Sequence, residues 1–516
     1  MSKMPSVMSH SFSQVPKAEI PRSSFDRSSG RKTTFNAGYL VPVFCDEVLP
    51  GDTFNLSATF FARLATPLHP IMDNMRLTSF FFFVPFRLIW DNWQKFMGEQ
   101  DNPGDSTDYL MPQMLAPVGG YQANTIYDYF ALPTLVANFA HWSAPLRAYN
   151  LVYNDWFRDQ NLQNSVKVNK GDTNDPTSDY TLLRRGKRHD YFTSSLPFPQ
   201  KGPAVDIPLG TSAPIKTAAG AGNAIGIESA LGASRSMLLG AGGGFLSPDG
   251  TPAPFPMYAD LTQATGATIN SLRQAFAVQK LYERDARGGT RYTEIVRAHF
   301  NVVSPDARLQ RPEYLGGGQS PINLYSVPQT SANDAQPTPQ GNLAAYGTAS
   351  GSNHGFTHSF TEHGVVIGLV SVQADLNYQQ GLERFWSRRT KFDFYWPALS
   401  HIGEQAVLNK EIYTQGTAAD DLVFGYQERY AEYRYKPSTI TGEFRSNFPQ
   451  SLDTWHLAQD YSALPALNAN FIVDNPPIDR TIAVPSEPQF IMDSYMRLRC
   501  ARPMPVYGVP GMIDRF

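Results

Sequence analysis

Four consecutive phenylalanines at residues 80–83 constrain the fold of this chain more than any other feature. Successive side chains of a strand point to opposite faces, so a strand with one solvated face alternates apolar and polar residues. This run does not alternate, and Pro85 ends it because proline has no N–H to donate to a ladder. We therefore predict a buried core strand, covered by a packed sheet on one face and by inserted loops or a neighbouring subunit on the other, with these core residues: Phe80, Phe81, Phe82 and Phe83.

Composition narrows the class of protein. Among 516 residues, 42% are hydrophobic and 17% are charged, which is below the usual quarter and suggests that much of the surface packs against other protein. The net charge of −3 excludes a polycation built for nucleic acid. With only Cys45 and Cys500, a disulfide framework is not expected and a reducing compartment is favoured. No secretory signal is visible, and the apolar run at residues 80–86 is too short to insert in a membrane, which takes about 20 residues.

Short runs of β-branched and aromatic residues recur along the chain, separated by long connections. We predict a mainly β fold, an antiparallel β-sandwich of about eight strands with very long inserted loops that carry short helices. Strands are expected within residues 33–64, 79–85, 354–376, 421–437 and 489–504, and helices over 127–140, 148–157 and 268–283.

Three stretches are expected to lie outside this core. Residues 1–35 are polar and without periodicity, so we predict an extended N-terminal arm, and a frayed terminus is an equal alternative. The remaining residues, 36–516, are predicted to form one domain. Residues 204–258 are rich in Gly and Pro, which indicates either an exposed protrusion or a flexible linker. The Gly-rich stretch 316–355 has the same loop-like composition.

Signatures of catalysis are absent from the sequence: no P-loop, HExxH or GxSxG motif occurs. The densest ligand-like cluster is His354, His358, Glu362 and His363, but strand alternation places His363 on the other face, so ordinary polar roles are favoured over a metal site. A glycosidase dyad such as Asp190 with Glu228 cannot be placed from sequence and stays open. We expect no enzyme activity, no cofactor and no metal.

Basic residues gather at two places besides the N-terminal arm, in residues 182–192 and 383–396. The second cluster interleaves Arg and Lys with Phe and Trp, a pattern that suits single-stranded nucleic acid. A solvated loop or an intersubunit salt-bridge patch is the favoured interpretation of both. The arm is the better candidate for contact with nucleic acid, through Lys17, Arg22, Arg27, Arg31 and Lys32.

The sequence resembles a known family over nearly its whole length. "NAGYLVPVFCDEVLPGDTFNL" (36–56), "ARLATPLHPIMDN" (62–74) and "FFFVPFRLIWDNWQKFMGEQ" (81–100) are similar to the major capsid protein of gokushoviruses, small single-stranded DNA phages of the microvirus family. The similarity continues through 186–203, 272–317, 354–388 and the C-terminal "RPMPVYGVPGMIDRF". It implies an eight-stranded viral jelly roll and the protomer of an icosahedral (T=1) shell around a circular single-stranded DNA genome.

The resemblance also implies partners and a location. The protein would reside in the virion capsid, assembled in the host bacterial cytoplasm with scaffolding and pilot-type proteins, and a small basic DNA-binding virion protein would help to hold the genome. The 204–258 protrusion would meet a bacterial host receptor, and the candidate contact residues are Met237, Leu238, Phe245 and Phe255. The alternative from another class is a β-sandwich carbohydrate-active enzyme or lectin, which would be a small oligomer with a carboxylate cleft.

Overall fold

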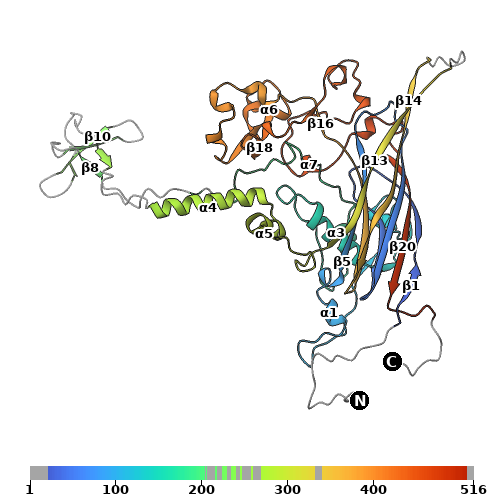
Figure 1. Ribbon diagram of the computed structural model, residues 1–516. Helices are drawn as coiled ribbons and strands as arrows, with labels where there is room; N and C mark the ends of the chain where they lie inside the picture. The colour runs from blue at the N-terminus through green and yellow to red at the C-terminus, as the bar shows by residue number, and fades with distance from the viewer. Residues whose placement is uncertain are drawn as a thin grey trace. The chain divides into compact units, whose positions relative to one another are not determined.

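The structure, a computed structural model, describes residues 21–203, 205, 269–331 and 340–507, together with the backbone of five short strands between residues 215 and 259 (Figure 1). The chain divides into two compact units, which are described separately below. Unit 1 comprises residues 1–199 and 290–516, and unit 2 comprises residues 200–289.

Unit 1 is built on one curled antiparallel sheet (Figure 1). Its strand order is β1-β20-β4-β14-β13-β5-β15-β3, and β2 also pairs with β20. Because β1 and β2 pair with successive parts of β20, they form one interrupted edge, and the nine strands occupy eight positions. The predicted eight-stranded, mainly β architecture is confirmed, with these strands: β1 Ser23–Asp26, β2 Ser29–Phe35, β3 Val41–Val48, β4 Thr53–Leu64, β5 Met75–Pro85, β13 Glu313–Pro328, β14 Leu343–Ser359, β15 Gly364–Ala374 and β20 Phe490–Arg502.

The inner core of the sheet joins strands from the two ends of the strand order. Buried side chains of β3, β15 and β5 meet those of β4 and β20 in one apolar cluster, so the two halves of the sheet face each other across it. In β20 every second residue from Phe490 to Cys500 is buried, as expected for a strand with one solvated face. All eleven residues of β15 are buried, so this strand is covered on both faces.

The four phenylalanines of β5 divide between two cores. Phe81 and Phe83 belong to the inner core, and the ring of Phe83 lies 4.8 Å from that of Phe360. Phe80 and Phe82 point to the opposite face and contact the ring of Phe157 at 5.2 and 5.8 Å. The prediction of a strand covered on both faces is confirmed, with the refinement that Phe80 is only half-buried.

The outer cover is the segment of residues 86–183, called the cover segment below. Its helices are α1 Trp93–Phe96, α2 Ile126–Tyr129 and α3 Ala144–Val152, which continues into a π-helical turn, Tyr153–Phe157, and its strands β6 Gln113–Leu115 and β7 Ala140–Trp142 pair. Their apolar side chains join those of β5 and β15 in a second core. The predicted helix over 127–140 is wrong, because the chain turns at Ala131, whose φ is 62°, and Pro133 follows.

A second insertion, residues 375–489, consists of short elements with a third, smaller apolar core. The strands β17 Glu404–Leu408 and β18 Val423–Glu428 pair with each other, as do β16 Asn377–Tyr378 and β19 Ser438–Thr439, and the helices are α6 Asn409–Ile412 and α7 Ala469–Ile472. The strand predicted within residues 421–437 is present as β18, but it lies in this small sheet and not in the main sheet. Alternating residues mark β18 as a strand, but the alternation is the same whichever sheet the strand joins.

The Gly-rich stretch 316–355 is not a loop, as its composition suggested, because most of it lies in β13 and β14. Glycine is needed there for close approach. A Cβ at Gly317 would lie 2.1 Å from the carbonyl oxygen of Ser79, and one at Gly355 would lie 1.9 Å from that of Leu56. These small residues let β13 and β14 pass directly against their neighbours, β5 and β4.

The N-terminal arm predicted over residues 1–35 is shorter than expected. Residues 23–35 are extended, but β1 and β2 pair with β20, so this half of the predicted 1–35 arm is part of the sheet. Its polar composition reflects an edge position, where one side of the strand meets solvent. Residues 1–20, including Lys17, lie outside the described residues.

Unit 2 contains the helix α4 Ile269–Gly288, which confirms the helix predicted over 268–283 and extends it, while the predicted cap Thr268 lies outside the described residues. The short strands pair locally, β8 Ile215–Thr217 with β12 Met257–Ala259, and β10 Ser234–Leu239 with β9 Ala224–Glu228 and β11 Phe245–Leu246. The helix α5 Tyr292–Phe300 belongs to unit 1. Among the described residues, no helix is long and apolar enough to cross a membrane.

Candidate assembly surfaces

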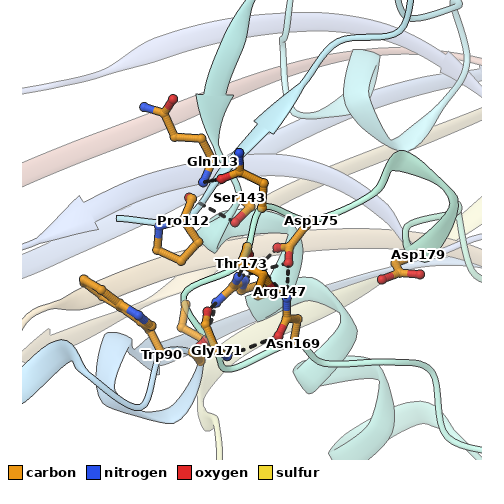
Figure 2. A network of polar contacts seen from close by, with 12 residues as sticks. Trp90, Pro112, Gln113, Ser143, Arg147, Asn169, Gly171, Thr173, Asp175 and Asp179 are labelled. Atoms are coloured by element: carbon orange, nitrogen blue, oxygen red, sulfur yellow. Dashed lines mark hydrogen bonds and ion pairs between the residues drawn. The ribbon is translucent and has the colours of Figure 1, made fainter. Parts of the chain in front are cut away.

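A buried ion pair holds the cover segment together (Figure 2). Arg147 on α3 and Asp175 are both buried, and the guanidinium binds the carboxylate twice, with Nε–Oδ2 at 2.7 Å and Nη2–Oδ1 at 3.0 Å. The remaining guanidinium hydrogens bind the carbonyls of Ile89, Gly171 and Thr173. One side chain thus ties two segments of the chain, at Ile89 and at residues 171–175, to one helix.

The carboxylate of Asp175 is fully partnered. Tyr180 donates to Oδ2 at 2.9 Å and Asn169 donates to Oδ1 at 2.5 Å. Burial by itself would raise the pKa of Asp175, but the hydrogen bonds from Arg147 and Asn169 outweigh it, and the pKa lies below its ordinary value. The network is a structural support for the outer face of the sheet, and the sequence offered no signal for it, because Arg147 and Asp175 lie far from any motif.

The four described residues predicted to contact nucleic acid each have a partner within the protein. Arg27 pairs with Asp46 at 2.8 Å, and Lys32 lies 3.6 Å from Asp493. Arg22 donates to the hydroxyl of Thr53 at 2.6 Å. Arg31 is half-buried, donates to the carbonyl oxygen of Tyr129, and has its pKa lowered by burial. They lie along one sheet edge, and Arg22, Arg27 and Lys32 are exposed.

The basic cluster at residues 182–192 joins the sheet to the second insertion. The guanidinium of Arg184 stacks on Tyr39 at 4.0 Å, and that of Arg185 lies 4.9 Å from the ring of Phe80. Lys187 is buried over the ring of Phe471 at 4.4 Å, and burial lowers its pKa to about 8. Arg188 pairs with Asp375 at 2.6 Å. The favoured interpretation as a solvated loop or an intersubunit patch thus needs correction, because these four cations have partners within the chain and Lys187 is buried.

The histidine cluster is dispersed among separate partners. His354 is buried, and its two ring nitrogens each lie 2.9 Å from a serine hydroxyl, that of Ser79 and that of Ser320. Glu362 pairs with Arg87 at 2.6 Å, and the ring of His363 packs on that of Trp93. In the described part of the chain no group of three or more His, Cys, Asp or Glu side chains could hold a metal ion.

The residues predicted to meet a host receptor are placed only by their backbone. Met237 and Leu238 lie in β10 and Phe245 lies in β11, so these three belong to the paired strands of unit 2. Phe255 lies outside the described residues. Both cysteines are free thiols, with Cys500 buried in the inner core and Cys45 exposed.

An exposed aromatic surface in the second insertion is the most unusual feature of unit 1. The basic cluster at residues 383–396 lies here, together with residues near β18. We define the aromatic patch as eight side chains, each 49–71% exposed: Phe385, Trp386, Phe392, Phe394, Tyr395, Trp396, Tyr433 and Tyr435. Soluble monomers seldom expose so many large apolar groups together, so the patch indicates an interaction surface.

Arg388 holds the aromatic patch in one arrangement. Its guanidinium lies 4.5 Å from the ring of Tyr433, 5.2 Å from that of Phe394 and 5.8 Å from that of Phe385. Only 11% of this side chain is exposed, and it lies 3.8 Å from the carboxylate of Glu432. These three rings are therefore pre-organised around a buried cation, which lowers the entropy lost on binding.

A cleft of about 320 Å³ borders the patch at Trp386 and Tyr435. Glu411 is buried in its wall, where it accepts a hydrogen bond from Tyr191 at 2.8 Å and pairs with Arg384 at 3.0 Å. Burial raises the pKa of Glu411 above its ordinary value. Glu411, Tyr191 and Arg384 are thus partnered by one another, which fits a structural role better than acid–base chemistry.

The fold and the exposed surfaces define a class of protein. An eight-position curled sheet with long insertions, a large exposed aromatic patch and charged groups that are already paired fits a subunit of a viral shell. The family model described as "Capsid protein (F protein)" matches residues 13–512, and the chain belongs to this family.

The relatives agree with this assignment. The chain is 51% identical to capsid protein VP1 of Bdellovibrio phage phiMH2K, with 98% of each chain covered, and 48% identical to capsid protein VP1 of Chlamydia phage 1, with 99% of each covered. It is 37% identical to capsid protein VP1 of Spiroplasma virus 4, with 98% of this chain and 97% of the relative covered. The protein is thus a structural component of a virion, of the kind found in small single-stranded DNA phages, and not an enzyme.

Proposed function

We propose that this chain is the protomer of an icosahedral (T=1) shell that encloses a circular single-stranded DNA genome. The curled sheet with a closed core supports this proposal, because the second insertion then exposes its aromatic patch for contact with neighbouring copies. The family match over residues 13–512 points the same way.

The first test is assembly. The chain is expressed alone and together with the other virion proteins, and the products are separated by sedimentation and imaged by negative-stain electron microscopy. Closed particles of uniform size are expected in at least one of the two preparations. A small soluble species in both would contradict the shell function.

The insertion at residues 204–258 is the proposed host-attachment site, with Met237, Leu238, Phe245 and Phe255 as its contact residues. Its place in unit 2, outside the unit that holds the sheet, supports this role, since binding functions concentrate on loops. In particles that lack residues 206–256, joined by a short Gly/Ser linker, we expect normal shell yield and at least a tenfold loss of adsorption to host cells. Unchanged adsorption would refute the attachment role.

Contact with the genome is proposed for the N-terminal basic residues Lys17, Arg22, Arg27, Arg31 and Lys32. The net charge of −3 cannot neutralise a genome, so the proposal includes a small basic virion protein as the main counter-charge. Scaffolding and pilot-type proteins are proposed as assembly partners. Particles with Lys17→Gln and Arg22→Gln should contain less DNA per shell by absorbance at 260 and 280 nm, and an unchanged ratio would count against the arm.

A further inference from the structure

The aromatic patch is large enough to be one side of a stable protein interface. Eight aromatic side chains that are each about half exposed present on the order of 800 Å² of surface, which matches the share of one partner in a standard interface. Aromatic residues and arginine are also the types enriched at the centres of interfaces. We therefore expect the patch to bind a partner, and the charges around it indicate the chemistry of that partner.

The free charges at the patch are positive. The acidic groups nearby are already engaged: Glu432 with Arg384 and Arg388, and Asp393 with the backbone of Arg389 and Thr390. Neither Arg389 nor Lys391 forms an ion pair in the described part of the chain, and both residues are exposed. The occupant should therefore carry apolar groups together with unpaired carboxylates.

A segment of this chain has that chemistry. The acidic loop, residues 97–110, follows α1 and contains Glu99, Asp101, Asp105 and Asp108 but no basic residue. Its two ends are apolar and exposed, Met97 by 48% and Leu110 by 87%. Asp101 lies 3.8 Å from Lys95 and Asp105 caps the turn at Asn102, which leaves the exposed Glu99 and Asp108 available for a partner.

The acidic loop and the aromatic patch lie at opposite ends of unit 1. Figure 1 shows α1 at the lower end of the curled sheet and the orange second insertion, with β18 and α6, at its upper end. One copy cannot bring the two together, but two copies can meet head to tail. Such a contact uses different surfaces on the two copies, and it closes into a ring when the rotation between copies permits.

We propose that the aromatic patch of one copy binds the acidic loop of a second copy, in a head-to-tail contact that repeats around the shell. Met97 and Leu110 pack on the aromatic rings, and Glu99 and Asp108 pair with Arg389 and Lys391. Apolar contact supplies most of the affinity, and the opposite charges set the register. The inference rests on the proposed shell function and adds the two surfaces that join its subunits.

Charge reversal on each side tests the contact. One variant carries Arg389→Glu with Lys391→Glu, a second carries Glu99→Lys with Asp108→Lys, and a third carries all four changes. Assembled particles are quantified by sedimentation under conditions in which the wild type assembles. We expect each two-site variant to lower the particle yield at least tenfold, and the four-site variant to return to within about threefold of the wild type.

Folding and competing occupants are controlled in the same preparations. All four positions are exposed, so the thermal unfolding midpoint of each protomer should stay near that of the wild type. If the midpoint of a variant falls, the milder pair Arg389→Gln with Lys391→Gln replaces the patch variant, and Glu99→Gln with Asp108→Asn replaces the loop variant. Wild-type yield from either two-site variant, or a four-site variant no better than the worse of the two, overturns the proposal.

Two further outcomes distinguish the docking contact from a nucleic-acid site and from failure of the shell itself. If the patch reversal leaves assembly unchanged but abolishes binding of a fluorescent oligothymidylate, measured by anisotropy, the patch binds nucleic acid and the docking proposal is wrong. If the wild type itself forms no particle with all virion proteins present, the shell function fails and the docking fails with it. Loss of assembly in the two-site variants alone overturns neither the fold nor the shell function.

Discussion

The cover segment and the second insertion are both rich in aromatic residues, but they use them in opposite ways. In the cover segment, Trp90 and Trp93 are 3% and 7% exposed and pack with β5 and β15 in the second core. In the second insertion, Trp386 is 71% exposed and Trp396 is 49% exposed. Both segments supply similar side chains, so their difference in exposure depends on which other parts of the chain pack on them.

The comparison shows how one composition serves both folding and assembly. Burial of an aromatic ring stabilises the protomer when the covering group belongs to the same chain, and stabilises a complex when it belongs to another chain. In the cover segment the sheet provides that surface. In the second insertion the described residues leave one side of the rings open, and a neighbouring subunit is proposed to close it.

The largest effect is expected in the strand that both cores share. Phe82→Asp places a carboxylate among the rings of Trp156, Phe157 and Tyr314, where it has no partner. Burial of an unpaired charge should abolish folding or shell formation, measured as soluble protein and as particles by sedimentation. Soluble, assembled particles from this variant would contradict the two-core description of β5.

The second largest loss of protomer stability is expected when the buried ion pair of the cover segment is broken. Arg147→Ala leaves the buried carboxylate of Asp175 without its main partner and should destabilise the protomer by about 3–5 kcal/mol in urea unfolding. The double variant Arg147→Met with Asp175→Leu removes both charges and should recover most of that loss. A single variant that unfolds at the wild-type urea concentration would show that the cover segment does not depend on this network.

A matched pair of tryptophans sharpens the comparison directly. Trp93→Ala should cost about 3–5 kcal/mol of protomer stability because the side chain is buried in the second core. Trp386→Ala should cost less than about 0.5 kcal/mol because the side chain is largely exposed. The same Trp386 variant should nevertheless lower the particle yield, whereas equal losses of protomer stability in both variants would remove the distinction between core and patch.

The smallest expected effect is a pH dependence inside the inner core. Burial lowers the pKa of His354 below its ordinary value of 6.5, so the unfolded chain binds a proton that the folded chain resists. Stability from this residue is therefore complete above pH 6.5 and is lost as the pH falls below it, with a slope of at most about 1.4 kcal/mol per pH unit.

The measurement is urea unfolding of the protomer at several pH values, for the wild type and for His354→Gln. Because other groups titrate in the same range, the informative quantity is the difference between the two slopes. Two chains that lose stability in parallel between pH 7 and 5 would mean that His354 takes up its proton without cost in the folded state.

Many of the strands and the longest helix could be predicted from the local pattern of apolar and polar residues. Side-chain direction in a strand repeats every two residues and is set by the local backbone. The unbroken apolar runs therefore predicted β5 and β15 as strands buried on both faces, and alternation is the matching pattern in β20, which has one solvated face. The helix α4 was predicted for a similar reason, from its 3.6-residue period. The family blocks at residues 36–56 and 81–100 indicated a capsid protein before any pairing was known.

The tertiary structure decided which strands join the main sheet and which surfaces stay open. β18 has the pattern of a core strand, yet it pairs with β17 outside the main sheet. The glycines of β13 have the composition of a loop, but they lie in a strand that packs directly against β5. Contacts between residues far apart in the chain decide which strands pair. They also decide the Arg147–Asp175 ion pair and the exposure of Trp386. Local sequence determines which way a side chain points, but only the folded chain determines what lies in front of it.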